Sequence, residues 1–269
     1  MGVDSIACAT LALRREGPVL HVTLNRPEQR NAMSLQMVQE LRAVLAQAEM
    51  GAEVRVLVLR GAGGHFCAGA DLKDMAAVRL QLPARPNALA EANAAFGELC
   101  VAYAGTGIAT VAVLEGTVMG GGLGLACVCD VALAGTSALF RLPETSLGVV
   151  PAQIAPFLVE RLGYAEARRL AVTGARLNAQ AALDLRLVHA VHAAGALDSA
   201  LAAVLAEILQ NAPHAVAATK ALMAKARVQA PASLVQEAAR VFAEAAQGPE
   251  GSEGTAAFLS KRKASWVPQ

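Results

Sequence analysis

Three consecutive glycines at positions 120–122 restrict the fold more than any other feature of this chain. They follow an apolar, β-branched segment at 108–116 that is typical of a buried strand. An apolar run at 122–129 follows and is typical of a short helix. Glycine lets a backbone turn sharply and lets another group approach its amides closely. The feature therefore predicts a strand, a loop with bare N–H groups, and a helix, in that order.

Strand-like and helix-like segments alternate through the first half of the chain. Apolar runs bounded by glycine or proline are typical of strands, and apolar residues at helical spacing are typical of helices. From Gln153 onward the pattern is mostly helical. The order predicts an α/β fold class with a helical C-terminal part. We expect two strands around a turn at Gly17 and Pro18 within 11–25, strands at 54–61, 130–135 and 138–142, helices at 34–50 and 87–104, and a mobile loop at 81–87.

Composition excludes several classes of protein. Of the 269 residues, 55% are hydrophobic and 17% are charged, which predicts extensive burial and leaves room for an oligomer. The net charge of +1 creates no field that would attract nucleic acid. The chain shows no targeting segment and no long charge-free span. Five cysteines without framework spacing suit a reducing compartment, so we expect a cytoplasmic protein without nucleic-acid or membrane partners.

Common nucleotide, esterase and metal motifs are incomplete in this chain. The dinucleotide fingerprint fails because Phe66 and Cys127 stand where its third glycine would be, and no phosphate-loop lysine or G-x-S-x-G follows. Cys127 and Cys129 lie in an apolar run and are expected to be buried thiols. His189 and His192 would face opposite sides of a strand. We therefore expect no metal site.

Two glycine-containing loops, at 65–75 and 116–124, each follow a buried strand and precede a helical segment. Backbone N–H groups at a helix start are free donors, and the helix dipole adds positive potential there. Two such donors aimed at one point form an oxyanion hole. Close packing of helix against strand explains the same glycines. The loops alone leave both explanations open.

Five segments resemble the enoyl-CoA hydratase/isomerase family, also called the crotonase family. They occur in the family's order and spacing, and the resemblance covers nearly the whole chain. Each segment alone would be a weak signal, whereas the five together are highly specific. The segments are "LNRPEQRNAMS", "HFCAGADLKDM", "GTVMGGGLGLACVCDVALAG", "FRLPETSLGVVP" and "AFLSKRKASW".

The resemblance implies a fold, an assembly and a substrate class. It implies a crotonase-like core of repeated β-β-α units over residues 1–195 and a C-terminal helical trimerisation region over 196–269. It also implies a homotrimer or a dimer of trimers, with an acyl-CoA substrate and no cofactor beyond its CoA moiety. Carried onto this sequence, the backbone donors that hold the thioester oxygen of an enolate-like intermediate are those of Ala70 and Gly121.

One of the two family carboxylates is missing here. In the two-base hydratases a glutamate stands two residues after the triple glycine, and this chain has Gly124 there. The second carboxylate is present as Glu144, after a proline. Two carboxylates divide the proton transfers of hydration, whereas a single one can move a proton between carbons or act as a lone-base hydratase. The resemblance therefore implies Glu144 as the main acid/base.

Binding of CoA needs local cations because the net charge is close to zero. Arg26, Arg30 and Lys73 are candidates for phosphate contacts, with the adenine near segment 65–73. The tail residues Phe258 and Lys261 match family residues that reach CoA, often in a neighbouring subunit. The complete set of expected substrate contacts is Arg26, Arg30, Ala68, Asp71, Lys73, Gly124, Phe258 and Lys261.

Several functions stay open at this point. We expect hydration of an enoyl-CoA, and the segment "PAQIAPF" at 151–157 resembles hydratases of branched, terpenoid or leucine-derived substrates. A single-base double-bond isomerase is the first alternative. A non-catalytic CoA-thioester-binding protein is the second, and a thioesterase or decarboxylase on the same fold is the third. The acyl chain, the pathway and the choice of trimer or hexamer are not identified by the residues.

Overall fold

A computed structural model describes residues 3, 6–51 and 53–268, and its central feature is a six-stranded sheet. The first two strands form an antiparallel hairpin, and every later neighbour pairs in parallel, for example Val111 with Val131. The predicted α/β fold class is confirmed. The strand order is β1 (Leu11–Glu16), β2 (Val19–Leu24), β3 (Val56–Gly61), β4 (Ala109–Leu114), β6 (Val131–Gly135) and β9 (Ala190–His192).

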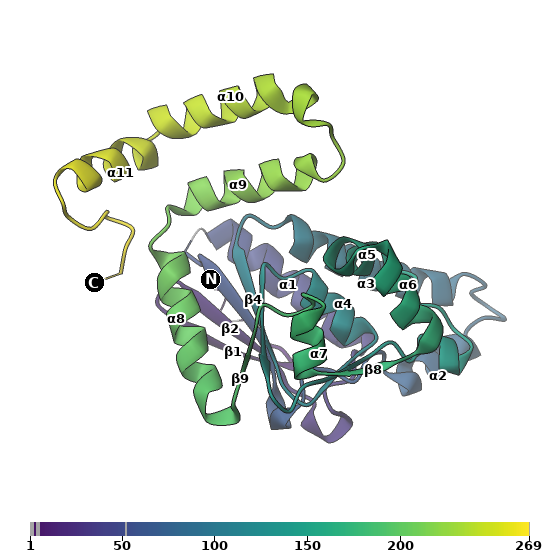
Figure 1. Ribbon diagram of the computed structural model, residues 1–269. Helices are drawn as coiled ribbons and strands as arrows, with labels where there is room; N and C mark the ends of the chain where they lie inside the picture. Colours follow the sequence, from purple (N-terminus) through teal and green to yellow (C-terminus); the bar gives the residue numbers. More distant parts are fainter. Residues whose placement is uncertain (1–2, 4–5, 52, 269) are drawn as a thin grey trace.

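Helices cover both faces of this sheet, which explains its continuous apolar strands (Figure 1). Along β3, Leu57 and Leu59 face one hydrophobic cluster while Val56 and Val58 face the other. The larger cluster includes side chains of α1 (Leu35–Gly51), α3 (Ala88–Gly105) and α4 (Gly121–Cys127). The smaller one is closed by α8 (Leu197–Leu209).

A second, three-stranded sheet is present, and the sequence predicted only one of its strands, at 138–142. It contains β5 (Thr117–Met119), β7 (Leu139–Arg141) and β8 (Arg176–Asn178). β5 lies inside the predicted loop 116–124, and β8 and β9 lie in the part predicted to be helical. Each has only three residues, so no alternating pattern can develop, and distant pairing partners define it instead.

The remaining elements of the core are short and surround the two sheets. The predicted loop at 81–87 is a run of turns. The short elements around the two sheets are the 3₁₀ turns η2 (Pro27–Gln29), η3 (Ala62–Gly64), η4 (Glu144–Leu147) and η5 (Ala194–Ala196), and the helices α2 (Leu72–Leu80), α5 (Ala155–Leu162), α6 (Tyr164–Thr173) and α7 (Ala179–Asp184).

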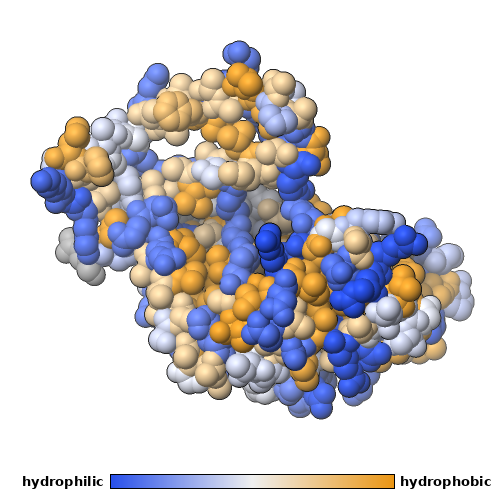
Figure 2. Space-filling model, in the orientation of Figure 1, coloured by the Kyte–Doolittle hydropathy of each residue, from blue (hydrophilic) through white to orange (hydrophobic). Residues whose placement is uncertain are grey.

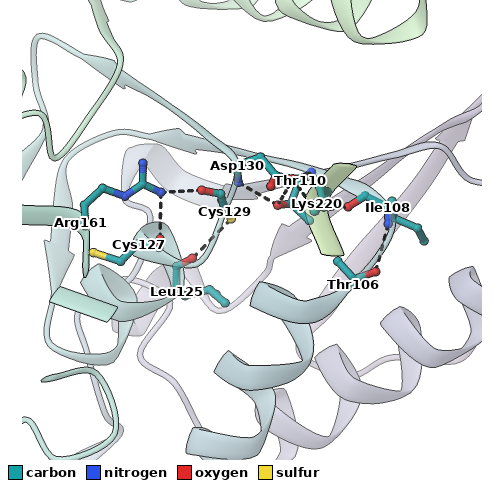
Figure 3. A network of polar contacts seen from close by, with 9 residues as sticks. All are labelled: Thr106, Ile108, Thr110, Leu125, Cys127, Cys129, Asp130, Arg161 and Lys220. Carbon is teal, nitrogen blue, oxygen red and sulfur yellow. Dashed lines mark hydrogen bonds and ion pairs between the residues drawn. The ribbon is translucent and has the colours of Figure 1, made fainter. Parts of the chain in front are cut away.

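Helices α9 (Pro213–Ala226), α10 (Pro231–Gln247) and α11 (Pro249–Leu259) form an arm that stands away from the core (Figure 1). Lys220 joins α9 to the core through the carboxylate of Asp130 at 2.6 Å and the Ile108 carbonyl at 2.7 Å (Figure 3). Large apolar side chains are exposed on the arm (Figure 2): Met223, Val228, Val235, Phe242, Phe258 and Leu259. The predicted boundary between the core and the C-terminal helical region, at 195/196, stays a prediction. Helix α8 follows this boundary but packs on the sheet, and only the helices after it project from the core.

Among the described residues, no single helix has both the length and the apolarity to cross a membrane. The segments 194–209 and 213–226 meet that requirement only when taken together, and they are bent by 95° at the break between them.

Candidate active site

The two glycine-containing loops lie side by side. The Cys67 N–H donates to the Thr117 carbonyl at 2.9 Å, and the Met119 N–H donates to the Cys67 carbonyl at 2.9 Å. These bonds form a short parallel bridge between the segments. The bridge brings the residues after Cys67 next to the glycines that begin α4.

Glycine is required where the loops touch. Gly69 has φ of +96° and Gly120 has φ of +49°, conformations that side chains strongly disfavour. A Cβ built on Gly120 would lie 3.6 Å from the Cα of Gly69, and one on Gly122 would lie 2.6 Å from the Cβ of Cys67. Both a positive φ and a close approach therefore keep side chains out of this contact.

Among the described residues, the backbone N–H groups of Ala70 and Gly121 donate to no loop or cap acceptor, and the same holds for Gly69 and for the next two residues of α4. One neighbour of each is bonded: Gly120 donates to the Arg141 carbonyl at 3.1 Å, and Asp71 donates to the Met33 carbonyl at 3.0 Å. Gly121 begins α4, where the first N–H groups have no partner within the helix. Two free amides on adjoining loops are the arrangement that an oxyanion hole needs.

Glu144 begins η4 and points its carboxylate at the same glycines. A Cβ built on Gly120 would lie 2.8 Å from Oε1 of Glu144. The other oxygen, Oε2, is buried and has no hydrogen-bond partner within the described part of the chain. Burial raises the pKa of the Glu144 carboxyl above its ordinary value, and a bond from its own backbone N–H offsets part of that rise. Such a carboxyl is suited to general acid or base chemistry.

The position of the missing carboxylate is filled by a hydrocarbon side chain. Gly124 is buried in α4, and a Cβ built there would lie 2.1 Å from Cγ2 of Ile154. On the same helix, a Cβ on Gly121 would lie 3.2 Å from the ring of Phe96. Sequence reasoning missed both Ile154 and Phe96. The sequence signal that contains Ile154 was the "PAQIAPF" segment at 151–157, which resembles hydratases of branched or terpenoid substrates.

Arg26 and Asp71 were predicted to contact substrate, and the structure pairs them with each other. Nη2 of Arg26 lies 2.7 Å from Oδ2 of Asp71, and Nη1 of Arg26 donates to the Ala32 carbonyl at 2.7 Å. Asp71 also accepts from the Lys73 N–H at 2.9 Å and so begins α2. The desolvation that would raise the pKa of Asp71 is outweighed by these bonds, which lower it. The pair joins the first loop to the second, and its contact with substrate stays a prediction.

The other predicted phosphate contacts are free to bind. Arg30 and Lys73 are exposed and form no ion pair among the described residues. The Arg30 carbonyl accepts from the Ala68 N–H at 3.0 Å, which places Ala68 and Arg30 on adjoining loop segments. Arg30 and Lys73 therefore remain the candidates for phosphates.

The predicted tail contacts are not brought to this region within one chain. Phe258 and Lys261 are exposed at the end of α11, which lies on the opposite side of the molecule from α2 (Figure 1). Their contact with CoA, in this subunit or a neighbouring one, stays a prediction.

The histidine and cysteine motifs have structural partners. Nδ1 of His189 accepts from the Ala132 N–H at 2.9 Å, and Arg161 donates to the carbonyls of Cys127 and Cys129 at the end of α4 (Figure 3). Burial raises the pKa of both thiols to about 12. The described residues contain no group of three metal-ligating side chains in binding geometry.

Comparisons with known proteins agree with this geometry. The sequence profile described as "Enoyl-CoA hydratase/isomerase" matches residues 14–269. A mouse protein named "Enoyl-CoA hydratase domain-containing protein 2, mitochondrial" is 36% identical over 93% of this chain and 84% of its own.

Two solved structures are also similar. Pseudomonas aeruginosa AtuE is 53% identical with a TM-score of 0.93, over 96% of this chain and all of that one. An enoyl-CoA hydratase/isomerase from Marinobacter aquaeolei is 48% identical with a TM-score of 0.94, over 97% of this chain and all of that one.

Proposed function

The chain belongs to the enoyl-CoA hydratase/isomerase family, and we propose that it hydrates an enoyl-CoA thioester with Glu144 as the main acid/base. The observation that carries the proposal is one contact region. Two unbonded amides, of Ala70 and Gly121, lie on loops that meet at Gly69 and Gly120, and the partly buried carboxylate of Glu144 lies against Gly120.

One carboxylate is sufficient for the proton transfers of the proposed hydration. The amides of Ala70 and Gly121 hold the thioester oxygen as negative charge develops on it. Glu144 takes a proton from water while the water oxygen bonds to Cβ, and the electron pair of the double bond moves into an enolate. The protonated Glu144 then returns a proton to Cα, which closes the cycle.

Double-bond isomerisation is the second candidate, and a specific observation favours it. Ile154 offers no hydrogen bond at the position where a second carboxylate would hold water. In isomerisation Glu144 would move a proton between two carbons without water.

A panel of straight and branched enoyl-CoAs decides between the two reactions. Loss of the conjugated double bond with uptake of water supports hydration, whereas migration of the double bond without uptake of water supports isomerisation. CoA-thioester binding without turnover of any member supports the non-catalytic alternative, and release of free CoA or of carbon dioxide supports a thioesterase or a decarboxylase.

The raised pKa of Glu144 predicts a shifted acid limb in the activity profile. The proposed step needs the carboxylate, so kcat/KM falls as pH drops through the pKa of Glu144. Because burial raises that pKa, the fall begins at a higher pH than for an ordinary glutamate, whose pKa is about 4.3. Rates between about pH 4 and pH 8 measure it. An activity that stays level down to the ordinary glutamate range contradicts the assignment.

Arg30 and Lys73 are predicted to bind the phosphates of CoA. The double change Arg30→Ala with Lys73→Ala is expected to weaken acetyl-CoA binding by about tenfold or more, since a hydrogen bond to a charged group contributes about 1.5–3 kcal/mol. Calorimetry measures the affinity. Arg169→Ala is the matched control, because Arg169 is an exposed cation on α6. Unchanged affinity in the double variant removes these residues from the site.

The arm predicts self-association. Its exposed apolar side chains form a surface of the kind that interfaces bury, and the family resemblance implies a trimer or a dimer of trimers. Sedimentation at micromolar concentration is expected to show one of these assemblies, and a monomer would reject the prediction.

We also propose that the protein is cytoplasmic. All five cysteines are free thiols, which is typical of proteins in a reducing compartment and supports this proposal.

A further inference from the structure

Two successive side chains before α5 fit into the gaps left by two glycines. The Oε1 atom of Gln153 lies 2.1 Å from where a Cβ on Gly97 would be, and Cγ2 of Ile154 lies 2.1 Å from where a Cβ on Gly124 would be. Gly97 belongs to α3 and Gly124 to α4. Residues 153 and 154 therefore form a wedge between the two helices.

The position of Ile154 is next to the proposed oxyanion hole. Residues 121 and 124 are three apart in α4 and lie on the same face of the helix. A side chain at 124 would project beside the atoms held at the Gly121 amide, and the methyl group of Ile154 takes that volume. Ile154 is only 2% exposed, so it cannot move aside easily.

The wedge is anchored by a polar contact. Nε2 of Gln153 donates to Oδ1 of Asn93 on α3 at 2.8 Å. Phe96, one turn further along α3, reaches Gly121 with its ring. The side of the site next to Gly124 is therefore a hydrocarbon wall: the half-buried ring of Phe96 is its accessible part, and the buried Ile154 supports it from behind Gly124.

We propose that Ile154 is a specificity-determining residue of this site, because it fills the place of a polar side chain with hydrocarbon and supports the apolar wall against which the acyl chain packs. The proposal rests on the proposed acyl-CoA function. Ile154 leaves no room for a side chain at 124 and offers water no partner there, so Glu144 is the group that exchanges protons with the acyl chain. The ligand chemistry that fits the wall is the apolar part of an acyl thioester.

Binding of saturated acyl-CoAs tests the wall separately from the reaction, since these probes cannot be hydrated or isomerised. We expect wild-type protein to bind isovaleryl-CoA more tightly than free CoA in calorimetry. Ile154→Ala should reduce this preference by about tenfold or more, the discrimination that one methylene supplies in an apolar pocket. Ile154→Val removes a single methylene and should shift the preference in the same direction by less.

Leu158→Ala is the matched control, because Leu158 lies one turn further along α5, is 1% exposed and belongs to the same hydrophobic cluster. It should lower the melting temperature and leave the preference for isovaleryl-CoA unchanged. If Ile154→Ala and Leu158→Ala have the same effect on the preference, Ile154 is a packing residue and the proposal is wrong. A wild type without any preference for the acyl thioester overturns it as well.

The steric contact between positions 124 and 154 gives an independent test. Gly124→Ala should weaken isovaleryl-CoA binding, and adding Ile154→Ala should restore part of it, because the second change makes room for the first. Additive losses contradict the steric assignment. Turnover of enoyl-CoAs by the wild type is measured in parallel: binding preference without turnover rejects the proposed reaction and retains the role of Ile154.

Discussion

The Glu144→Gln variant is expected to lose nearly all turnover of enoyl-CoA while it still binds acyl-CoA. Loss of one general acid/base lowers kcat by about 10²–10⁴-fold, and the upper part of that range is expected where no second carboxylate can substitute. Gly124 has no side chain and Ile154 fills its surroundings, so position 124 supplies no such substitute. Steady-state rates give kcat, and calorimetry with acetyl-CoA gives binding.

Stability should change in the opposite direction from activity. Burial raises the pKa of Glu144, so the native state holds this proton more tightly than the unfolded chain. The stabilisation from that proton is complete below the ordinary glutamate pKa and is lost as pH rises through the raised one. Glutamine has no charge to desolvate, so at neutral pH the variant should unfold at a higher urea concentration than the wild type.

Glu166→Gln is the matched control for both measurements, because Glu166 is a glutamate on α6 that pairs with Arg169 at the surface. It should keep the wild-type rate. A near wild-type rate in Glu144→Gln itself would place the base elsewhere and remove the residue from the proposed mechanism.

Much of the fold was accessible from local pattern. The strands of the main sheet at 54–61 and 108–116 are buried on both faces, so they appear in the sequence as apolar runs, and the structure confirms them as β3 and β4. The three-residue strands β5, β8 and β9 were missed or expected to be helix or loop. Their existence depends on partners far away in the sequence, such as Phe140 for Leu177.

The candidate site was also predictable only where local pattern marks it, and not where it depends on contacts between distant residues. The two loops could be located because glycines mark both places where the backbone turns or approaches closely, and the family resemblance implied that both hold the same oxygen. The pairing of Arg26 with Asp71 and the seating of Ile154 against Gly124 could not, because each joins residues 30 or more positions apart without any periodic signal. The sequence showed an absent side chain at 124, and only the three-dimensional arrangement shows what fills its place.

Gly120→Ala is expected to have the second largest effect, by displacing the carboxylate of Glu144. The new Cβ would lie 2.8 Å from Oε1 of that residue, too close for an ordinary contact. The carboxylate is the free end of a side chain, so it can move aside at little cost in stability, but it leaves its place beside the loops. Misplacement of a catalytic group by about 1 Å can lower the rate about 10²-fold. We expect kcat to fall by about that factor.

The backbone contributes a separate cost that a control can isolate. Gly120 has φ of +49°, so alanine there adds strain of about 1–3 kcal/mol whatever its neighbours. Gly17 has φ of +56° in the β1–β2 turn, and a Cβ there would meet nothing within 4 Å. Gly17→Ala should therefore lower the melting temperature and leave kcat unchanged, whereas Gly120→Ala should lower both. If Gly120→Ala has the same kcat as Gly17→Ala, Glu144 is not held against Gly120 during the reaction. Backbone strain alone would then explain the effects of both substitutions.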